Sequence, residues 1–445
     1  MSTDTPVFYL PIEVAARELD ARLLLAHRAL AAGCRVVIGQ QWATVANLAN
    51  VRPGVVFFKG INRIQTNWMK LARRAGHRMV AIDEEATAIC DPDFVVKECN
   101  PALLELVDAI FMQGAFQHGV YAERFPHAHA RFRITGNPRW DLLRNEFRHF
   151  FTDDVASIRE RFGRFILINT NFGFVNTSWG KPEDFIRICI NVGYVDPKSD
   201  TDKKWLNDQF QFERENLRAF RDMALRLEAR YPDHKIILRP HPSENIERWR
   251  KALDGRPRVQ VVSEGSAIPW ILASDLLVHN TCTTGVEAFV LDHPTITYCP
   301  FTNWCESIFT SNVVTPRAGS LDELFRMTDL ALGDRQAFID QGRGVYRTKL
   351  EEHFSYLEGP SSTEQIFREM QSLGAECPAV AVGGDGVLLP GRAYSDQPMQ
   401  DYQRAKITLT AEQVAIRFRQ LVTSIGQHAE PRVQTIGDSL FLMHP

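Results

Sequence analysis

One short run of the chain combines residue types that hold anions. Arg239-Pro240-His241-Pro242 follows the apolar run 235–238, and its two prolines stiffen the loop and fix where the Arg and His side chains point. A rigid, cationic loop at the end of a strand suits a phosphate or diphosphate. The alternative is a loop that merely ends a strand, but Arg and His between prolines are unusual there. The sequence therefore predicts ligand binding by Arg239, His241 and Pro242.

A second run, HNTCTTGVE at 279–287, joins a predicted strand to a predicted helix. Hydroxyls, backbone N–H groups and the helix dipole at such a turn form an anion site that needs no metal. Thr284 and Glu287 also have the spacing of a capping box, so a threonine can cap the helix while facing phosphate, and Glu287 can bond a ribose. The candidate binding residues here, with Asn169 at the end of the run 165–169, are Asn280, Thr281, Thr283, Thr284 and Glu287.

Acidic residues end two other predicted strands. Asp83-Glu84-Glu85 follows the run 79–82, and mutual repulsion is expected to raise one pKa toward the range useful for proton abstraction. The alternative is a solvated turn that caps the next helix. Glu13 follows the run 7–10 and is expected to share a cleft floor with the triplet, although a glutamate at a helix start is commonly only dipole-stabilising.

Several common signatures are missing. The chain has neither G-x-G-x-x-G nor G-x-x-x-x-G-K-[ST], which removes support for dinucleotide redox or P-loop chemistry. Asp91-Pro92-Asp93 has the spacing of a metal-binding D-x-D, but it does not directly follow an apolar strand and is interpreted as a turn. No Cys/His set has zinc spacing. We expect no metal site and no cofactor other than a donor substrate.

The elements that would position these residues alternate along the chain. Apolar runs such as 55–58, 109–112, 276–279 and 295–298 are separated by helical segments, which predicts parallel sheets covered on both faces. We expect doubly wound α/β domains at 1–160 and 161–372, with a long, irregular insertion or lid at 171–207. Residues 373–445 begin with a Gly- and Pro-rich linker and are expected to end as a helical tail.

Composition narrows the class of protein. The chain has 445 residues, of which 44% are hydrophobic, and this content is typical of a globular enzyme. Its formal net charge of −3 provides no basic surface large enough to predict binding to nucleic acid. Its eight cysteines form no C-x-x-C pair and are interpreted as buried free thiols. The start lacks a signal-peptide pattern and no run approaches eighteen apolar residues, so we expect a cytoplasmic protein.

Six phrases resemble the bacterial surface carbohydrate biosynthesis protein family, of the GT-B clan of glycosyltransferases. The resemblance covers roughly 6–370 and is carried by LPIEVAARELDARLLLA (10–26), VAIDEEA (80–86), TGNPRWDLL (135–143), ILINTNF (166–172), RPHPSEN (239–245) and HNTCTTGVEA (279–288). It implies two Rossmann-like domains facing a cleft, an N-terminal acceptor domain and a C-terminal nucleotide-sugar domain.

The order of three motifs is also similar to that in transferases that use CMP-activated sugars, including sialyl, Kdo and nonulosonate transferases. Those enzymes carry an acidic motif ending in Gly, an His-Pro motif and a Ser/Thr pair, and this chain has Asp83-Glu84-Glu85, His241-Pro242 and Thr283-Thr284. Ala86 stands where those families have Gly, which leaves open whether Glu84 or Glu85 is the catalytic acid.

The resemblance implies a metal-independent glycosyltransferase that moves a CMP-activated acidic sugar onto a surface polysaccharide or lipopolysaccharide acceptor. His241 would stabilise the leaving phosphate, and an acid of the triplet would deprotonate the acceptor. The rival functions are a UDP-N-acetylhexosamine 2-epimerase, a polyol-phosphate transferase of teichoic-acid type and a non-catalytic sensor, because a shared fold does not fix the reaction. The oligomeric state and a peripheral contact with the inner membrane are left open.

Overall fold

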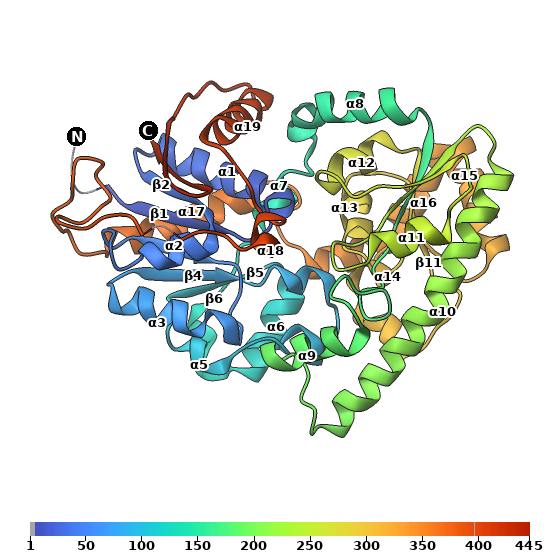
Figure 1. Cartoon of the computed structure of the whole chain (residues 1–445), viewed down its shortest axis with the longest axis horizontal. Coiled ribbons are helices and arrows are strands. Elements are labelled where there is room, and N and C mark those ends of the chain that lie inside the picture. Colours follow the sequence, from blue (N-terminus) through green and yellow to red (C-terminus); the bar gives the residue numbers. More distant parts are fainter. Residues whose placement is uncertain (1–4, 396) are drawn as a thin grey trace. The chain divides into compact units, whose positions relative to one another are not determined.

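A computed structural model describes residues 5–395 and 397–445, and the chain divides into two compact units. Unit 1 comprises Met1–Glu85, Cys99–Phe150 and His353–Pro445, and unit 2 comprises Ala86–Glu98 and Phe151–Glu352. Blue N-terminal and red C-terminal segments both belong to unit 1 in Figure 1. These units differ from the predicted division at 160 and 372. Residues 86–98 and 151–160 group with unit 2, and residues 353–445, which include the predicted tail, group with unit 1.

Unit 1 is built on an eight-stranded sheet of order β13-β14-β2-β1-β3-β4-β5-β6. Its first six strands pair in parallel because each is a short, continuous apolar run that is buried on both faces. They are β1 (Val7–Ile12), β2 (Arg35–Gln40), β3 (Val55–Phe58), β4 (Arg78–Ile82), β5 (Ala109–Met112) and β6 (Phe132–Ile134).

Helices cover both faces of this sheet. Phe8 of β1 packs against Phe367 of α17 (Ser362–Ala375), and the next side chain, Tyr9, points to the opposite face and contacts the ring of His77. Helix α1 (Ala15–Ala31) packs beside α17. The other helices of the unit are α2 (Gln41–Asn47), α3 (Thr66–Arg74), α5 (Pro101–Leu104), α6 (Ala115–Arg124), α7 (Pro138–Asp141), α18 (Asp401–Arg404) and α19 (Ala411–Ser424).

The expected helical tail is only partly helical. Helix α19 lies within the expected helical tail, and its Val414, Phe418 and Leu421 are fully buried. After it, β13 (Arg432–Gly437) and β14 (Leu440–His444) form an antiparallel hairpin, and β14 pairs antiparallel with β2. A Cβ at Gly39 would lie 2.1 Å from the carbonyl oxygen of Ser439, so the close approach of these segments requires a glycine.

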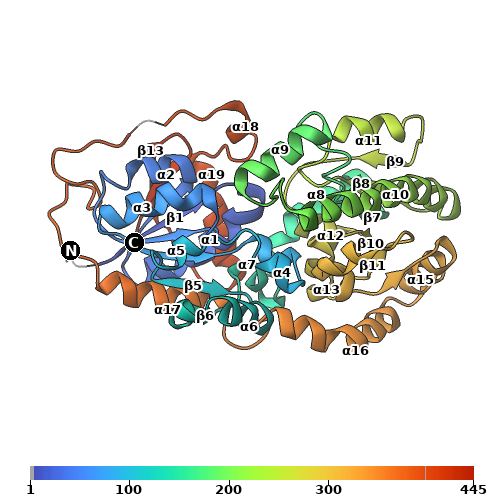
Figure 2. The same ribbon diagram turned by 90° about the horizontal axis from the view of Figure 1, so that it is seen from below.

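Unit 2 contains a six-stranded parallel sheet of order β12-β11-β10-β7-β8-β9. Figure 2 shows β8, β7, β10 and β11 side by side in that order. Strands β8 and β9 follow β7 on one side of the sheet, and β10, β11 and β12 lie on the other side of β7. The strand order therefore reverses between β7 and β10. The strands are β7 (Phe165–Asn169), β8 (Lys235–Arg239), β9 (Val259–Val261), β10 (Leu276–His279), β11 (Thr295–Tyr298) and β12 (Arg317–Ala318).

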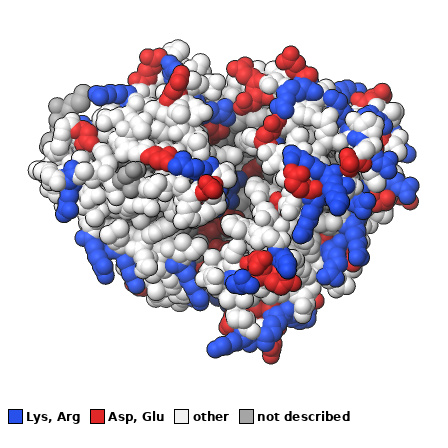
Figure 3. Space-filling view, in the orientation of Figure 1, with Lys and Arg blue, Asp and Glu red and all other residues white. Residues whose placement is uncertain are grey.

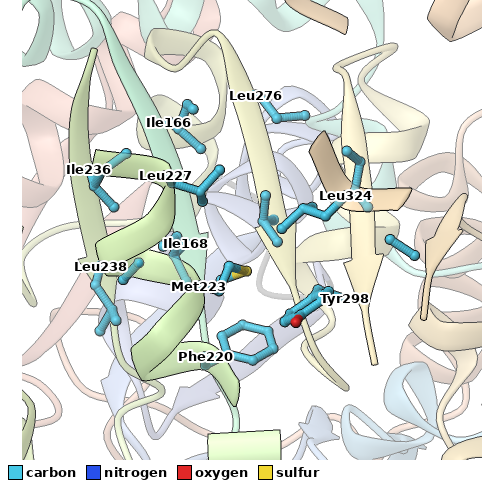
Figure 4. Packing of buried hydrophobic residues seen from close by; sticks show 14 of the residues in the cluster. Ile166, Ile168, Phe220, Met223, Leu227, Ile236, Leu238, Leu276, Tyr298 and Leu324 are labelled. Carbon is cyan, nitrogen blue, oxygen red and sulfur yellow. The ribbon is translucent and has the colours of Figure 1, made fainter. Parts of the chain in front are cut away.

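The core of unit 2 lies on both faces of this sheet. Helices α10 (Asp200–Arg230) and α15 (Leu321–Gly333) cover one face, where Phe220, Met223 and Leu227 of α10 pack on alternate strand residues such as Ile166 and Ile168 (Figure 4). Phe165, which precedes Ile166 on β7, points to the other face and packs on Trp270. Helices of that face include α8 (Thr152–Phe162) and α12 (Ala267–Ala273). The remaining helices are α4 (Pro92–Val95), α9 (Pro182–Val192), α11 (Ile246–Ala252), α13 (Thr284–Val290), α14 (Thr310–Val313) and α16 (Arg335–His353).

The predicted lid at 171–207 is more ordered than expected. It contains α9 and the first turns of α10, and its aromatic residues form a cluster in which Trp205 contacts Phe94, Phe174 and Tyr194. Farther along α10, acidic and basic side chains pair with each other, and both signs lie interspersed over this helix in Figure 3. The insertion is therefore a packed part of unit 2.

The predicted fold class is confirmed as two Rossmann-like, doubly wound α/β domains, with a parallel sheet in unit 2 and a mostly parallel sheet in unit 1. Among the residues that the structure describes, no helix is long and apolar enough to cross a membrane.

Candidate functional site

Three neighbouring strand ends of unit 2 bring the predicted binding residues together. In the register of the sheet, Asn169 at the end of β7 pairs with His279 at the end of β10 on one side and with Arg239 at the end of β8 on the other. Ligands of open α/β sheets bind beyond the carboxyl ends of strands where the strand order reverses. The loops after β7 and β10 flank that point in unit 2.

Hydrogen bonds join these two loops. Asn169 Nδ2 donates to Thr284 Oγ1 at 2.8 Å, and Asn171 Nδ2 donates to the carbonyl oxygen of Thr281 at 3.1 Å. Thr281 has a left-handed backbone conformation with φ of 52°, which is uncommon for a residue with a branched side chain. The two segments therefore form one fixed polar surface at the switch point.

Two amide side chains at this surface have an unused acceptor. Asn280 is fully buried and donates through Nδ2 to the carbonyl oxygen of Tyr298 at 2.9 Å. Its Oδ1 and the Oδ1 of Asn169 are both buried, and neither has a hydrogen-bond partner in the described chain. Buried polar atoms normally have partners, so these two oxygens are acceptors that the described chain leaves unsatisfied.

Helix α13 begins at Thr284, and the predicted capping box is not formed. Thr283 occupies the N-cap position and makes no side-chain hydrogen bond to the helix. The amides of Gly285, Val286 and Glu287 donate to the carbonyls of Cys282 and Thr283. These amides are engaged within the turn, so the predicted anion contact depends on the threonine hydroxyls rather than on a row of helix amides. Glu287 is buried.

A close contact fixes the orientation of the turn. His279 is fully buried, and a Cβ at Gly285 would lie 2.2 Å from its Nε2. Burial lowers the pKa of His279 to about 3, so its imidazole is neutral at physiological pH. His279 therefore has a packing role here, which requires a glycine at the start of α13.

Arg239 is engaged within unit 2. Its guanidinium donates to the carbonyl oxygens of Glu264 at 2.5 Å and Gly265 at 3.1 Å, and it lies over the ring of Trp270. Burial lowers the pKa of Arg239 to about 10. The side chain thus braces the 264–265 turn, and its contact with phosphate stays a prediction.

His241 presents its imidazole at the exposed end of the stiff loop. Its Nδ1 accepts a hydrogen bond from the backbone N–H of Ser243 at 3.2 Å. A neutral imidazole that accepts at Nδ1 carries its proton at Nε2, where it can donate to an oxyanion. Pro242 is also exposed.

Glu244 was missed by the sequence analysis, although it organises both binding loops. Its buried carboxylate accepts hydrogen bonds from Thr170 Oγ1 at 2.6 Å, Trp249 Nε1 at 2.8 Å, the backbone N–H of His241 at 3.1 Å and Asn176 Nδ2 at 3.2 Å. These donors come from the loop after β7, the loop after β8 and helix α11. A carboxylate that accepts from four donors on different segments fixes the loops relative to each other.

Replacing Thr170 by valine tests this arrangement. The change keeps the shape of a fully buried side chain and removes one donor to Glu244, so we expect the free energy of unfolding to fall by about 1.5–3 kcal/mol. Thr295→Val is the matched control, because Thr295 is buried in the same unit and its Oγ1 has no partner within the described residues. Urea unfolding measures both. Equal stability of the two variants would contradict the role of Glu244.

The acidic candidates lie at the carboxyl edge of the unit 1 sheet, where the strand order reverses between β1 and β3. Glu13 follows β1 and pairs with Lys59, which follows β3, and with Lys406 Nζ at 2.5 Å. Burial alone would raise the pKa of Glu13, but the two ammonium groups lower it to about 2. Glu13 is therefore a weak base, and neither lysine was predicted.

The expected repulsion within the acidic triplet is contradicted for Glu84. Its side chain is buried, contacts Arg22 at 3.5 Å and Arg139 at 3.7 Å, and accepts from Asn137 Nδ2 at 3.0 Å. Burial favours a raised pKa, yet these partners leave the pKa of Glu84 below its ordinary value. Glu84 is held as a buried anion and has the environment of a structural residue.

Its two neighbours in the triplet point elsewhere. Glu85 is largely exposed and pairs with Arg17 at 2.9 Å, while an Asp83 carboxylate oxygen accepts from the backbone N–H of Glu85 at 3.1 Å. The backbone carbonyl of Asp83 accepts from Gln113 Nε2 at 2.9 Å. The three carboxylates therefore have separate partners, and a catalytic role for Asp83 or Glu85 stays a prediction.

The D-x-D segment is a helix cap. Asp91 accepts hydrogen bonds from the backbone N–H groups of Asp93 and Phe94 at the start of α4, in agreement with its interpretation as a turn. Within 5–395 and 397–445, no group of three or more His, Cys, Asp or Glu side chains is arranged to hold a metal ion.

No protein-family model and no curated protein sequence matches the chain. Solved structures similar to it include the wall teichoic acid polymerase TagF, at 12% identity and a TM-score of 0.49 over 84% of this chain and 89% of that one. The Staphylococcus aureus MnaA–UDP complex has 12% identity and a TM-score of 0.46 over 84% and 98%. A Methanocaldococcus jannaschii UDP-GlcNAc 2-epimerase has 12% identity and a TM-score of 0.47 over 82% and 99%. At these values the likeness assigns no activity, substrate or site residue to this chain.

Proposed function

We propose that the chain is a glycosyltransferase that uses a nucleotide-activated sugar, with the donor bound at the carboxyl edge of unit 2. The observation that carries the proposal is the register of β8, β7 and β10, which brings Arg239, Asn169 and His279 to adjacent strand ends. The strand order reverses there, and a stiff loop and a hydroxyl-rich turn follow two of these strands.

The donor would be held by groups of two kinds. Nε2 of His241 and the hydroxyls of Thr283 and Thr284 supply donors for the phosphate. The unpartnered Oδ1 atoms of Asn169 and Asn280 supply acceptors for ribose or sugar hydroxyls. When the donor bond breaks, a hydrogen bond from His241 would stabilise the negative charge on the leaving phosphate.

The acceptor would bind at the carboxyl edge of unit 1, where Asp83 and Glu85 are the candidates for removing its hydroxyl proton. Glu84 is engaged by Arg22 and Arg139, and Glu13 has a pKa of about 2, so both are poor proton acceptors. The CMP-linked acidic sugars of the predicted donor class are the first donors to test, with the acceptor a surface glycan or glycolipid.

His241→Ala is expected to weaken binding of the donor nucleotide about tenfold, because it removes a hydrogen bond to a charged phosphate. Calorimetric titration with CMP, CDP and UDP measures the change. His428→Ala is the control, since His428 is also exposed but lies in unit 1. Unchanged affinity of the His241 variant for every nucleotide that the unaltered protein binds would remove this residue from the site.

A panel of CMP-, CDP- and UDP-linked donors tests the reaction itself. Release of the nucleotide only when an acceptor is present supports glycosyl transfer, or polyol-phosphate transfer when the donor is CDP-linked to a polyol. Isomerisation of a UDP-N-acetylhexosamine without an acceptor would instead establish an epimerase. A rise in melting temperature with a nucleotide but no turnover of any donor would favour a binding subunit.

A further inference from the structure

A second polar site lies at the strand-order reversal of unit 1 and is built around Glu13. The carboxylate is shared by two ammonium groups, one from Lys59 after β3 and one from Lys406, which follows α18. All three side chains are partly exposed: Glu13 by 15%, Lys59 by 20% and Lys406 by 30%. A solute can therefore reach the charged atoms.

The backbone fixes Lys406 at this edge. Its carbonyl oxygen accepts from the N–H of Ala15 at 2.9 Å, which ties the segment to the start of α1. Nearby, Gln40 at the end of β2 donates through Nε2 to the carbonyl of Asp438 at 2.6 Å, and the N–H of Leu409 donates to Ser439 Oγ at 3.1 Å. The C-terminal segment thus contributes a residue to the site.

The site has more hydrogen-bond donors than acceptors. Each ammonium has three N–H groups, and one carboxylate cannot take up all six. Arg17 lies near Lys59 and pairs with Glu18 and Glu85 through its terminal nitrogens. Its buried Nε–H has no partner in the described chain.

The positive and negative charges near Lys59 and Lys406 are equal in number, but hydrogen-bond donors outnumber acceptors. Glu18 is buried, and it accepts from Arg17 and from the backbone N–H of Glu13 at 2.9 Å. Glu85 pairs with Arg17. Every carboxylate in this cluster therefore already has a partner. A ligand that fits must bring acceptor oxygens, and a negative charge would be attracted by both ammonium groups.

We propose that Lys59 and Lys406 form an oxyanion-binding site at the carboxyl edge of unit 1, completed by the C-terminal segment. This inference rests on the proposed function. The site would bind a phosphate or carboxylate group of the acceptor. It would favour anionic acceptors, because a neutral glycan can accept hydrogen bonds from the two ammonium groups but lacks the charge that strengthens such bonds.

The test is a calorimetric titration of the full-length protein with inorganic phosphate and, separately, with acetate, at low ionic strength to limit screening. Lys406→Met is expected to weaken binding of the preferred anion at least about tenfold. Arg404→Met is the matched control, because it removes a positive charge from α18, where Arg404 pairs with Asp438 at 3.1 Å rather than with Glu13. Tighter binding of phosphate than of acetate assigns a phosphate ligand, and the reverse order assigns a carboxylate.

Equal anion affinity of Lys406→Met and the unaltered protein would overturn the proposal, as would an equal loss in the Arg404 control. Lys59→Met provides a second variant if Lys406→Met does not fold, and the same tenfold loss is expected. CMP, CDP and UDP affinities are measured alongside and should not change, because the predicted nucleotide contacts lie in unit 2. Anion binding that depends on Lys406 in a protein that turns over no donor would refute the proposed function while leaving this site intact.

Discussion

Replacing Glu84 by alanine is expected to lower the free energy of unfolding by about 3–5 kcal/mol, one of the two largest effects expected for this protein. The carboxylate is buried together with the guanidinium of Arg22, whose side chain is only 2% exposed and stacks over the ring of Phe57. Removing Glu84 leaves that charge buried with its main counter-ion missing. Urea unfolding followed by far-UV circular dichroism measures the loss.

Glu85→Ala is the matched control for this prediction. Glu85 is the next residue, but its side chain is 55% exposed and its ion pair with Arg17 lies at the surface, so we expect a change within about 1 kcal/mol. If the two alanine variants are equally stable, Glu84 is not the structural residue described above. If Glu85→Ala abolishes turnover and leaves stability unchanged, the acid of the triplet that acts on the acceptor is Glu85 rather than Glu84.

The stability of unit 2 is expected to fall by on the order of 3–5 kcal/mol between about pH 4.5 and pH 8 because of a single carboxyl group. Burial raises the pKa of Glu213 from 4.5 to about 8, and Glu244 adds to the rise. Between these values the folded chain keeps a proton on Glu213 that the unfolded chain releases. Because the unfolded state binds fewer protons there, the free energy of unfolding decreases as the pH rises.

Glu213→Gln is expected to remove this dependence. Oε2 of Glu213 accepts from the backbone N–H groups of Phe174 and Val175, which the glutamine oxygen can replace. Gln209 donates through Nε2 to Oε1 of Glu213 at 3.0 Å, and once its amide turns over, its unpartnered Oε1 can accept from the new amide of residue 213. Urea unfolding from pH 5 to pH 8 compares the two proteins. Parallel stability curves would show that Glu213 titrates at its ordinary pKa in the folded chain.

The parallel strands could be predicted from the sequence because burial on both faces leaves a continuous apolar run. The predicted ranges 55–58, 109–112, 276–279 and 295–298 coincide with β3, β5, β10 and β11. The hairpin of β13 and β14 could not be predicted, because β13 (RVQTIG) mixes polar and apolar residues and none of them is fully buried. Its strand character depends on pairing with β14, which in turn pairs with residues near the start of the chain.

The candidate site was predictable in its residue types but not in its electrostatics. Strand ends followed by His241 or by Thr283 and Thr284 are visible in the sequence, and the sheet register brings their strands together. The partners of Glu84 lie on α1 and α7, and nothing local distinguishes Glu84 from Glu85. The role of Lys406 could not be predicted either, because it arises from a contact with Glu13 that is 393 positions away in the sequence.

The pairing of β14 with β2 has a consequence for synthesis on the ribosome. A hydrogen bond joins Gln40 to Asp438 across 398 positions, so the sheet of unit 1 gains β13 and β14 only after about 400 further residues have been made beyond β2. Until then β2, with its buried Val36, Val37 and Ile38, has an open edge that favours pairing with other chains. A nascent chain stalled before residue 440 is therefore the form in which this protein is most exposed to aggregation.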